Sequence, residues 1–171
     1  MAGKAIERLR RFAPFVALGG GLLALLVAAA FWLQRGAHLE LKGSIGKVRT
    51  LPLPDGSTVV VIDFRLKNIA DYPFVVRRVD VWLDAADGRS LQGAVASEPD
   101  AERLFTYYPI LGQKYNSTLV ARTRFAPKES LDRMVAARFE LPEEAVLERR
   151  NLRIRVEDVD GAVSELAEHK R

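Results

Sequence analysis

An uncharged, apolar run between residues 13 and 33 constrains this chain more than any other feature of its sequence. As a helix rising about 1.5 Å per residue it would measure roughly 30 Å, the thickness of a bilayer's hydrocarbon core. The run therefore predicts a single N-terminal transmembrane helix. The expected organisation is a basic cytoplasmic tail (1–12), the helix (13–33), a short linker (34–38), a folded domain (39–167) and a C-terminal tail (168–171).

The length of the run favours an uncleaved anchor over a cleaved signal peptide, whose apolar core is typically about 7–15 residues long. Trp32 would then lie near the far membrane interface, where indole rings concentrate. Cleavage after the small triplet at 28–30 stays open as the alternative. The residues expected to contact lipid are large and apolar: Phe15, Leu22, Leu25, Phe31 and Trp32.

The predicted location is the inner (cytoplasmic) membrane, with a single pass and a periplasmic or extracellular C-terminal domain. A short tail with four cations is a poor candidate for translocation, whereas long domains cross largely regardless of charge. Small residues at helical spacing, Gly20, Ala24 and Ala28, would allow close helix–helix contact and a homodimer.

The charge distribution argues against nucleic-acid binding. The chain has 26 Lys and Arg against 22 Asp and Glu; the first twelve residues hold four and one of these, which leaves 22 and 21. A nearly neutral domain lacks the clustered basic footprint that duplex binding requires. The absence of cysteine excludes disulfides, thiolate catalysis and cysteine-based zinc sites.

Apolar and polar residues alternate through most of the chain after residue 38, as in half-buried strands. Asp-Gly pairs at 55–56, 87–88 and 160–161 supply the turns between them. The pattern predicts a mainly β fold, an antiparallel immunoglobulin-like β-sandwich of about seven strands. The expected strands are 39–51, 58–67, 74–83, 90–95 (a short edge strand), 118–125, 134–139 and 151–159.

One short helix is inserted into this β pattern. Ser97 with Asp100 resembles a capping box, Pro99 fits a first helical turn, and apolar residues then recur at helical spacing. A helix is therefore predicted over 98–108, and a further helical turn over 143–147.

The segment Asn68-Ile-Ala-Asp-Tyr-Pro73, between two apolar strands, resembles the inter-strand break of immunoglobulin-like accessory domains on membrane-anchored bacterial envelope proteins. Telokin-like domains and the water-stress/hypersensitive-response (WHy) domains of the late-embryogenesis-abundant type carry a similar break. The resemblance covers residues 39–95 and implies a binding or structural role. It transfers no catalytic residue.

The sequence offers little to a catalytic mechanism. Its two histidines, His38 and His169, lie at the two ends of the predicted domain, and no phosphate-binding loop or nucleophile elbow is present. Asp158 and Asp160 begin like a calcium loop, but the expected glutamate is replaced by His169. We therefore expect a protein that is not an enzyme and that uses no cofactor or metal.

Two features are candidates for binding a protein partner. The first is an aromatic cluster in and after the predicted helix, with Phe105, Tyr107 and Tyr108; its alternative interpretation is a plug that closes the sandwich. The second is a row of arginines on outward strand faces, which would otherwise be a solvated face with acidic partners. The arginines singled out are Arg122, Arg124, Arg153 and Arg155.

These observations predict an interaction or accessory module of an envelope complex. The alternative is a sandwich that holds an apolar ligand or a lipid at the membrane surface, which would need an internal cavity. A third alternative, a hydrolase, would need His38 or His169 beside a nucleophile. Replacement of both histidines without loss of function would exclude it.

Overall fold

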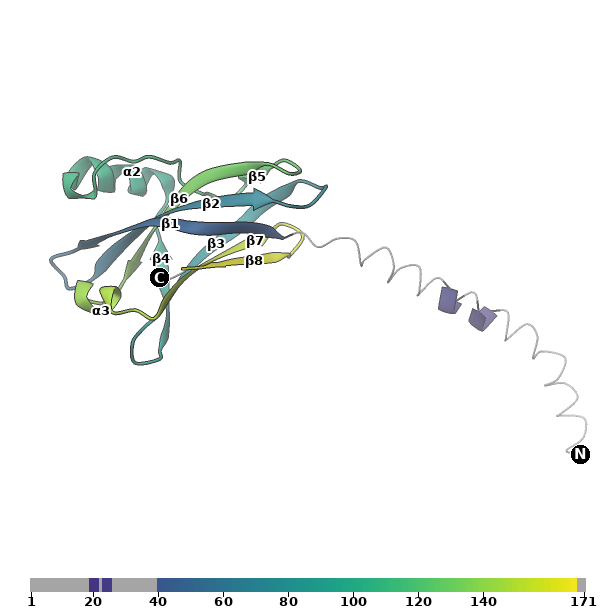
Figure 1. The fold of residues 1–171 in the computed structure, drawn as a ribbon, viewed down its shortest axis with the longest axis horizontal. Coiled ribbons are helices and arrows are strands. Elements are labelled where there is room, and N and C mark those ends of the chain that lie inside the picture. The colour runs from purple at the N-terminus through teal and green to yellow at the C-terminus, as the bar shows by residue number, and fades with distance from the viewer. Residues whose placement is uncertain (1–18, 22, 26–39, 169–171) are drawn as a thin grey trace, which may run out of the picture. The chain divides into compact units, whose positions relative to one another are not determined.

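The computed structural model describes residues 19–21, 23–25 and 40–168 (Figure 1). The chain divides into two units, residues 1–38 and 39–171, and each is considered by itself.

In the first unit, residues 19–21 and 23–25 are helical. No helix within the described residues combines the length and the apolar character needed to cross a membrane. The prediction of a transmembrane helix over 13–33 is corrected accordingly, and the single-pass location in the inner membrane is not supported. Part of the described stretch is a run of three glycines, each about 1 kcal/mol less favourable in a helix than alanine.

Most of the residues on which the anchor prediction rested lie outside the described residues: Phe15, Leu22, Ala28, Phe31 and Trp32. Gly20, Ala24 and Leu25 are described and exposed. Neither the lipid contact nor the homodimer through this segment gains support.

The second unit is built from antiparallel strands with short helices between them (Figure 1). The strands are β1 (Leu41–Pro52), β2 (Thr58–Asn68), β3 (Phe74–Asp84), β4 (Ser90–Val95), β5 (Arg124–Phe125), β6 (Ser130–Phe139), β7 (Asn151–Asp158) and β8 (Val163–Ala167). The helices are α2 (Glu98–Tyr107), the 3-10 turn η1 (Pro109–Leu111) and α3 (Glu143–Leu147).

All eight strands belong to one continuous sheet. Seven follow the order β1-β2-β6-β4-β3-β7-β8, and β5 pairs with β3. β1, β2 and β6 form one layer, and β3, β7 and β8 form the other (Figure 1). The mainly β, antiparallel prediction is confirmed, but the immunoglobulin-like sandwich of two separate sheets is wrong.

The strand that joins the layers is β4, which the sequence had suggested as an edge strand. Its first residues pair with β3, from Ser90 to Gly93, and Ala94 and Val95 pair with β6. At the changeover, a Cβ on Gly93 would lie 2.7 Å from the ring of Phe139. A glycine therefore allows β4 to pass from one layer to the other here, because any side chain at this position would overlap the Phe139 ring.

The two outer strands of the sheet also meet, so the sheet is nearly closed. The Leu41 amide donates to Ser164 Oγ at 2.8 Å, which ties β1 to β8. A Cβ on Gly43 would collide with the carbonyl oxygen of Arg65 and lie 3.0 Å from Leu166 Cδ2. Gly43 thus permits close contact both within the β1–β2 pair and across the closing seam.

The main hydrophobic core lies between the two layers. Phe74 and Phe125 meet edge to face, with ring centroids 6.3 Å apart. These two rings and that of Phe139 are buried among inward residues of both layers. Alternate residues of β2 point inward, since Val60, Ile62, Phe64 and Leu66 all belong to this core.

A second, smaller cluster lies on the outer face of β1, β2 and β6, beneath α2 (Figure 1). It contains Val59 and Val61 of β2, Met134 and Ala136 of β6, and Ala101 of α2. β2 is therefore apolar and buried on both faces along its first half. The inserted helix covers this face of the sheet and does not plug an open end.

Turn chemistry behaves as the sequence indicates. The glycines of the three Asp-Gly pairs all have positive φ, and Asp55 and Asp87 each accept a hydrogen bond from the amide two residues later. The strand predicted over 118–125 is wrong: residues 120–123 turn, with Arg122 at a φ of 68°, and only Arg124 and Phe125 form β5.

The Asn68–Pro73 segment has a structural explanation. Asn68 is fully buried, and its side-chain amide donates to the carbonyls of Tyr72 at 2.7 Å and Ala126 at 3.2 Å. Its Oδ1 accepts from the Ala70 amide at 3.0 Å. The asparagine thus fixes the β2–β3 connection and fastens it to the segment after β5.

Candidate protein-binding site

The chain from Ser97 to Ser117 lies on the outer face of the β1–β2–β6 layer, and we call it the cover. Its helix α2 begins at Glu98 and is capped by Ser97, whose Oγ accepts from the Asp100 amide at 3.3 Å. Two acidic residues in the first turn suit the positive end of the helix dipole. The helix gives way at Tyr108 to η1, where Pro109 has no amide hydrogen to continue it.

A groove of about 530 Å³ runs along one side of the cover, between α2 and the strands. Its floor comes from the start of β2 and the end of β4, and its wall from the side of α2. Aliphatic and aromatic side chains dominate its lining, with three charged ones among them. The lining residues are Leu53, Val59, Ala94, Val95, Ala96, Asp100, Arg103, Leu104, Tyr107, Tyr108 and Arg138.

Large apolar side chains project from the cover. Tyr107, which lines the groove, is 74% exposed, and Ile110 in η1 is 84% exposed. Tyr108 is also exposed and lines the groove. Rigid aromatic rings next to an apolar depression are the usual anchors of a protein interface.

Phe105, predicted to belong to the same aromatic cluster, has a different place. It is half-buried against the second cluster, and the guanidinium carbon of Arg49 lies 5.0 Å from its ring centroid. The structure therefore brings Tyr107 and Tyr108 together at the groove and assigns Phe105 to the packing beneath the cover.

Arg49 of β1 is held by the other end of the cover. Its guanidinium donates to the Leu111 carbonyl at 2.7 Å and to the Gln113 carbonyl at 2.9 Å. It also forms an ion pair with Asp63 at 2.7 Å, in which the two side chains are only 8% and 10% exposed. The centroid of the exposed Tyr115 ring lies 5.8 Å from the guanidinium carbon.

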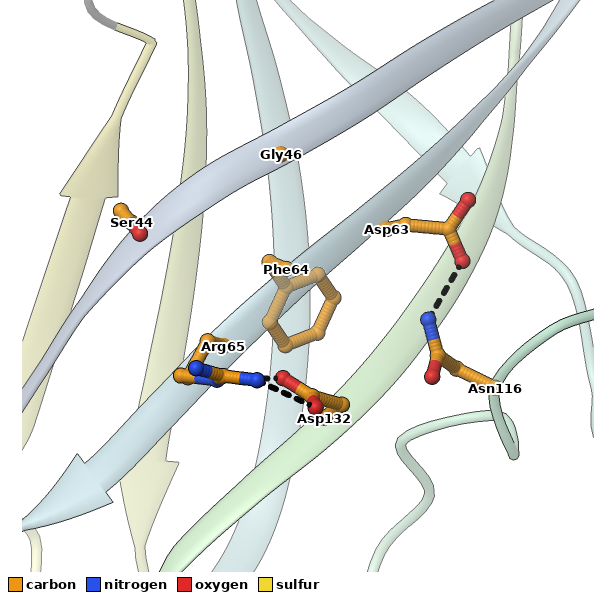
Figure 2. A pocket seen from close by; sticks show the side chains of 7 residues that line it. All are labelled: Ser44, Gly46, Asp63, Phe64, Arg65, Asn116 and Asp132. Atoms are coloured by element: carbon orange, nitrogen blue, oxygen red, sulfur yellow. Dashed lines mark hydrogen bonds and ion pairs between the residues drawn. The ribbon is translucent and has the colours of Figure 1, made fainter.

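A polar hollow of about 290 Å³ lies next to this ion pair (Figure 2). Figure 2 shows Asn116 donating to Asp63, at 2.9 Å, and Arg65 forming two hydrogen bonds to Asp132, each 2.7 Å long. Ser44 and the backbone of Gly46, at the β1 bulge, complete one rim. Opposite charges balance in this hollow, because each carboxylate faces an arginine.

The hydrogen bonds from Arg65 lower the pKa of the Asp132 carboxyl, and the same pair raises the pKa of Arg65. Both side chains are well exposed, at 66% and 47%. Their pairing is therefore that of a solvated surface ion pair, with little consequence for stability.

The arginines predicted as a basic face do not gather in one place. Arg153 and Arg155 point outward from β7, whereas Arg122 lies in the turn before β5 and Arg124 lies in β5, opposite Val75. Arg153 is bound by Asp84 at 2.8 Å and by Glu165 at 3.4 Å. The outward face of β7 therefore carries paired charges of both signs, and the binding role of these four arginines stays a prediction.

Asp158 and Asp160 serve the β7–β8 turn. Asp158 is buried; its carboxylate accepts from the Val75 amide at 2.6 Å and from the Asp160 amide at 3.0 Å. In the part of the chain that the structure describes, no group of three His, Asp or Glu side chains is placed to hold a metal ion. His38 and His169 lie outside the described residues.

Sequence reasoning missed the residues that fasten the cover: Arg49, Asp63 and Asn116. The sequence did contain one signal. Asp63 follows Val59 and Val61 on the outward face of β2, so a carboxylate stands in line with two apolar residues. A carboxylate in such a strand needs a partner when the face is covered.

No known family model matches this chain, and no curated protein matches it. Among solved structures, an uncharacterised β-sandwich protein from Clostridium difficile is 12% identical, over 74% of this chain and 84% of that one, with a TM-score of 0.40. The archaellum periplasmic stator protein FlaG from Sulfolobus acidocaldarius is 10% identical, over 74% and 98%, with a TM-score of 0.35.

A putative ApaA protein from Bordetella pertussis is 15% identical, over 77% of this chain and 89% of that one, with a TM-score of 0.34. None of these three is described as an immunoglobulin-like, telokin-like or WHy protein. Likenesses at this level of identity and TM-score support no inference about function.

Proposed function

We propose that residues 40–168 form a non-enzymatic accessory module that binds a partner protein at the groove beside α2. The observation that carries this proposal is the apolar groove with the exposed rings of Tyr107 and Tyr108 in its lining. Side chains of this size gain about 1.5–3 kcal/mol when they are buried, so a surface that exposes both favours a contact that removes them from water.

The charged residues that line the groove limit which partner segments can bind there. Arg138 is already paired with Asp55 at 2.9 Å, and Arg103 with Asp100 at 3.2 Å. A partner that brought a strong net charge would have to compete with these pairs. An apolar or aromatic segment with an uncharged centre suits the groove better.

The alternative of an apolar ligand held between the layers gains no support. Three of the four phenylalanines of the main core, Phe74, Phe125 and Phe139, line neither of the two hollows, and the fourth, Phe64, borders only the polar hollow beside Arg65 and Asp132. The module is therefore proposed to act through its surface.

Site-specific photocrosslinking tests this role. A photoreactive phenylalanine analogue replaces Tyr107 in one variant and Tyr72 in the other, because Tyr72 is 62% exposed but lies in the β2–β3 connection. We expect a discrete protein adduct from position 107 that is absent from position 72. The identified partner should then bind Tyr107→Ser at least tenfold more weakly than Tyr72→Ser. Equal adducts at both positions, or equal affinities, would exclude the groove as the binding surface.

A further inference from the structure

The cover is joined to the sheet by backbone hydrogen bonds at its two ends. At its start, the amide of Ala96 donates to the carbonyl of Ala136 at 2.8 Å. At its end, the amide of Met134 donates to the carbonyl of Ser117 at 3.0 Å, and that of Leu119 donates to the carbonyl of Met134 at 2.8 Å. Both attachments are to β6.

Between these ends, two side chains provide the hydrogen bonds that join the cover to the strands, within residues 40–168. Arg49 reaches the carbonyls of Leu111 and Gln113, and Asn116 donates to Asp63. The other side-chain bonds of the cover stay within it, as between Ser97 and Asp100.

Asp63 is the point where these contacts converge. Its Oδ2 accepts from Arg49 at 2.7 Å and its Oδ1 accepts from Asn116 at 2.9 Å. One carboxylate thus orients both side chains that hold the cover, so that its loss would weaken both contacts. We call Arg49, Asp63 and Asn116 the fastening triad.

The apolar contact beneath the cover is limited. Of the cover's own residues, Ala101 and Leu111 are buried in the second cluster, while Leu104 and Phe105 are partly buried. This contact is small beside the main core, which buries four phenylalanines between the layers. In addition, Nε of Arg49 is buried without a hydrogen-bond partner, which raises the free energy of the closed arrangement.

We propose that the cover is a lid that opens as a local unit, about its two attachments to β6, and that the fastening triad sets how often it opens. Segments with few buried apolar contacts and few hydrogen bonds to the rest of a fold open at lower free energy than the core. Opening would expose Val61, Met134 and Ala136 on the outer face of the sheet. It would also reshape the groove, because Leu104 and Tyr107 line it from the cover.

Amide hydrogen exchange of the full chain tests the lid directly. The cover contains hydrogen-bonded amides at Ala101, Tyr108, Leu111 and Gly112, whose acceptors also belong to the cover. A helix of ten residues is only marginally stable once it leaves the sheet, so opening should expose these amides to exchange. We expect these amides to exchange at least tenfold faster than those of β2 and β6. Equal protection in the cover and in the two strands would overturn the proposal, because the cover would then open only with the whole domain.

Substitutions in the triad sharpen the test. In Asn116→Ala, one fastening hydrogen bond is lost, and exchange in the cover should accelerate about fivefold while that of β2 stays unchanged. Asp63→Asn leaves Arg49 without its counter-charge and should act more strongly. If Asp63→Asn fails to fold, Asn116→Ala and Arg49→Lys, which keeps the charge but loses the forked donor geometry, still decide the question.

The matched control is Asp132→Asn, which breaks an exposed ion pair on the same face of the sheet. This control should leave exchange in the cover unchanged. Acceleration that is equal in Asp132→Asn and Asn116→Ala, or that spreads evenly over all strands, would contradict a role for the triad. This test is independent of any partner, so it can fail while the groove still binds one.

Discussion

The two outer faces of the sheet differ although both derive from alternating strands. Outside β1, β2 and β6, the outward residues Val59 and Val61 of β2 are buried beneath the cover. Outside β3, β7 and β8, most outward residues are charged, and the exposed Arg78 pairs with both Asp80 and Glu157. Alternation therefore determines which residues point outward from the sheet. Whether those residues are exposed to solvent depends on whether another segment of the chain covers that face.

The difference also separates two uses of charge. The Arg49–Asp63 pair is almost fully buried and holds the cover. The Arg153–Asp84 pair is about a quarter exposed on both sides and lies on the uncovered face. Breaking a buried pair by removing one partner typically costs several kcal/mol, whereas an exposed pair contributes up to about 1 kcal/mol.

The largest effect is expected at the seam that both layers share. In Gly43→Ala, the new methyl group would collide with the Arg65 carbonyl and press on Leu166, so the β1–β2 register or the closure must yield. The free energy of unfolding should fall by roughly 3 kcal/mol, measured by urea denaturation. Ser44→Ala, at the neighbouring exposed position, is the control and should change it by less than about 0.5 kcal/mol. Equal midpoints for the two variants would show that the seam tolerates a side chain.

A smaller effect distinguishes the covered face from the uncovered one. Val61→Ala removes two buried methyl groups beneath the cover and should lower the free energy of unfolding by about 2 kcal/mol. Arg155→Ala, at an exposed outward position of β7, should lower it by less than about 0.5 kcal/mol. Similar losses from both substitutions in thermal and urea denaturation would mean that the cover adds no effective burial.

The smallest effect concerns acid on the uncovered face. The hydrogen bond from Arg153, followed by that from Ser90, lowers the pKa of Asp84 below its ordinary value of 3.8. A carboxyl with a lowered pKa in the folded state stabilises the fold above its ordinary pKa, and this contribution is lost as the pH falls through the folded-state value.

In Asp84→Asn, the fall of Tm between pH 5 and 2 should therefore be slightly shallower than in the unmodified protein, as followed by circular dichroism. Arg153→Met keeps the carboxylate but removes the main cause of its shift, so it should flatten the profile similarly. A profile for Arg153→Met that matches the unmodified protein would assign the acid dependence to other carboxylates.

Local features of the fold were predictable from the sequence because local chemistry determines them. The capping serine and the proline place α2, and the predicted 143–147 helical turn coincides with α3. The Asp-Gly turns and the long alternating β2 were likewise evident. Each of these depends on residues that are close together in the chain.

The misplaced features depend on partners that are distant in the chain. Ser90–Val95 is the right strand, but its position between two layers depends on Gly93 meeting Phe139. The fastening triad joins residues 49, 63 and 116, whose proximity follows from pairing and from the path of the cover. The groove could be predicted only in part, from Tyr107 and Tyr108, because its floor comes from other strands.

The strand order has a consequence for the chain as it is synthesised. β1 and β2 can form a hairpin early, but the other side of β2 pairs with β6, which follows much later in the sequence. Until Ser130–Phe139 has emerged from the ribosome, one edge of β2 has unpaired backbone amides and carbonyls. Because β2 also contains the apolar run Val59–Ile62, this edge can pair with a strand of another chain. Nascent chains that stop before β6 should therefore aggregate or require a chaperone, whereas those that include it should stay dispersed.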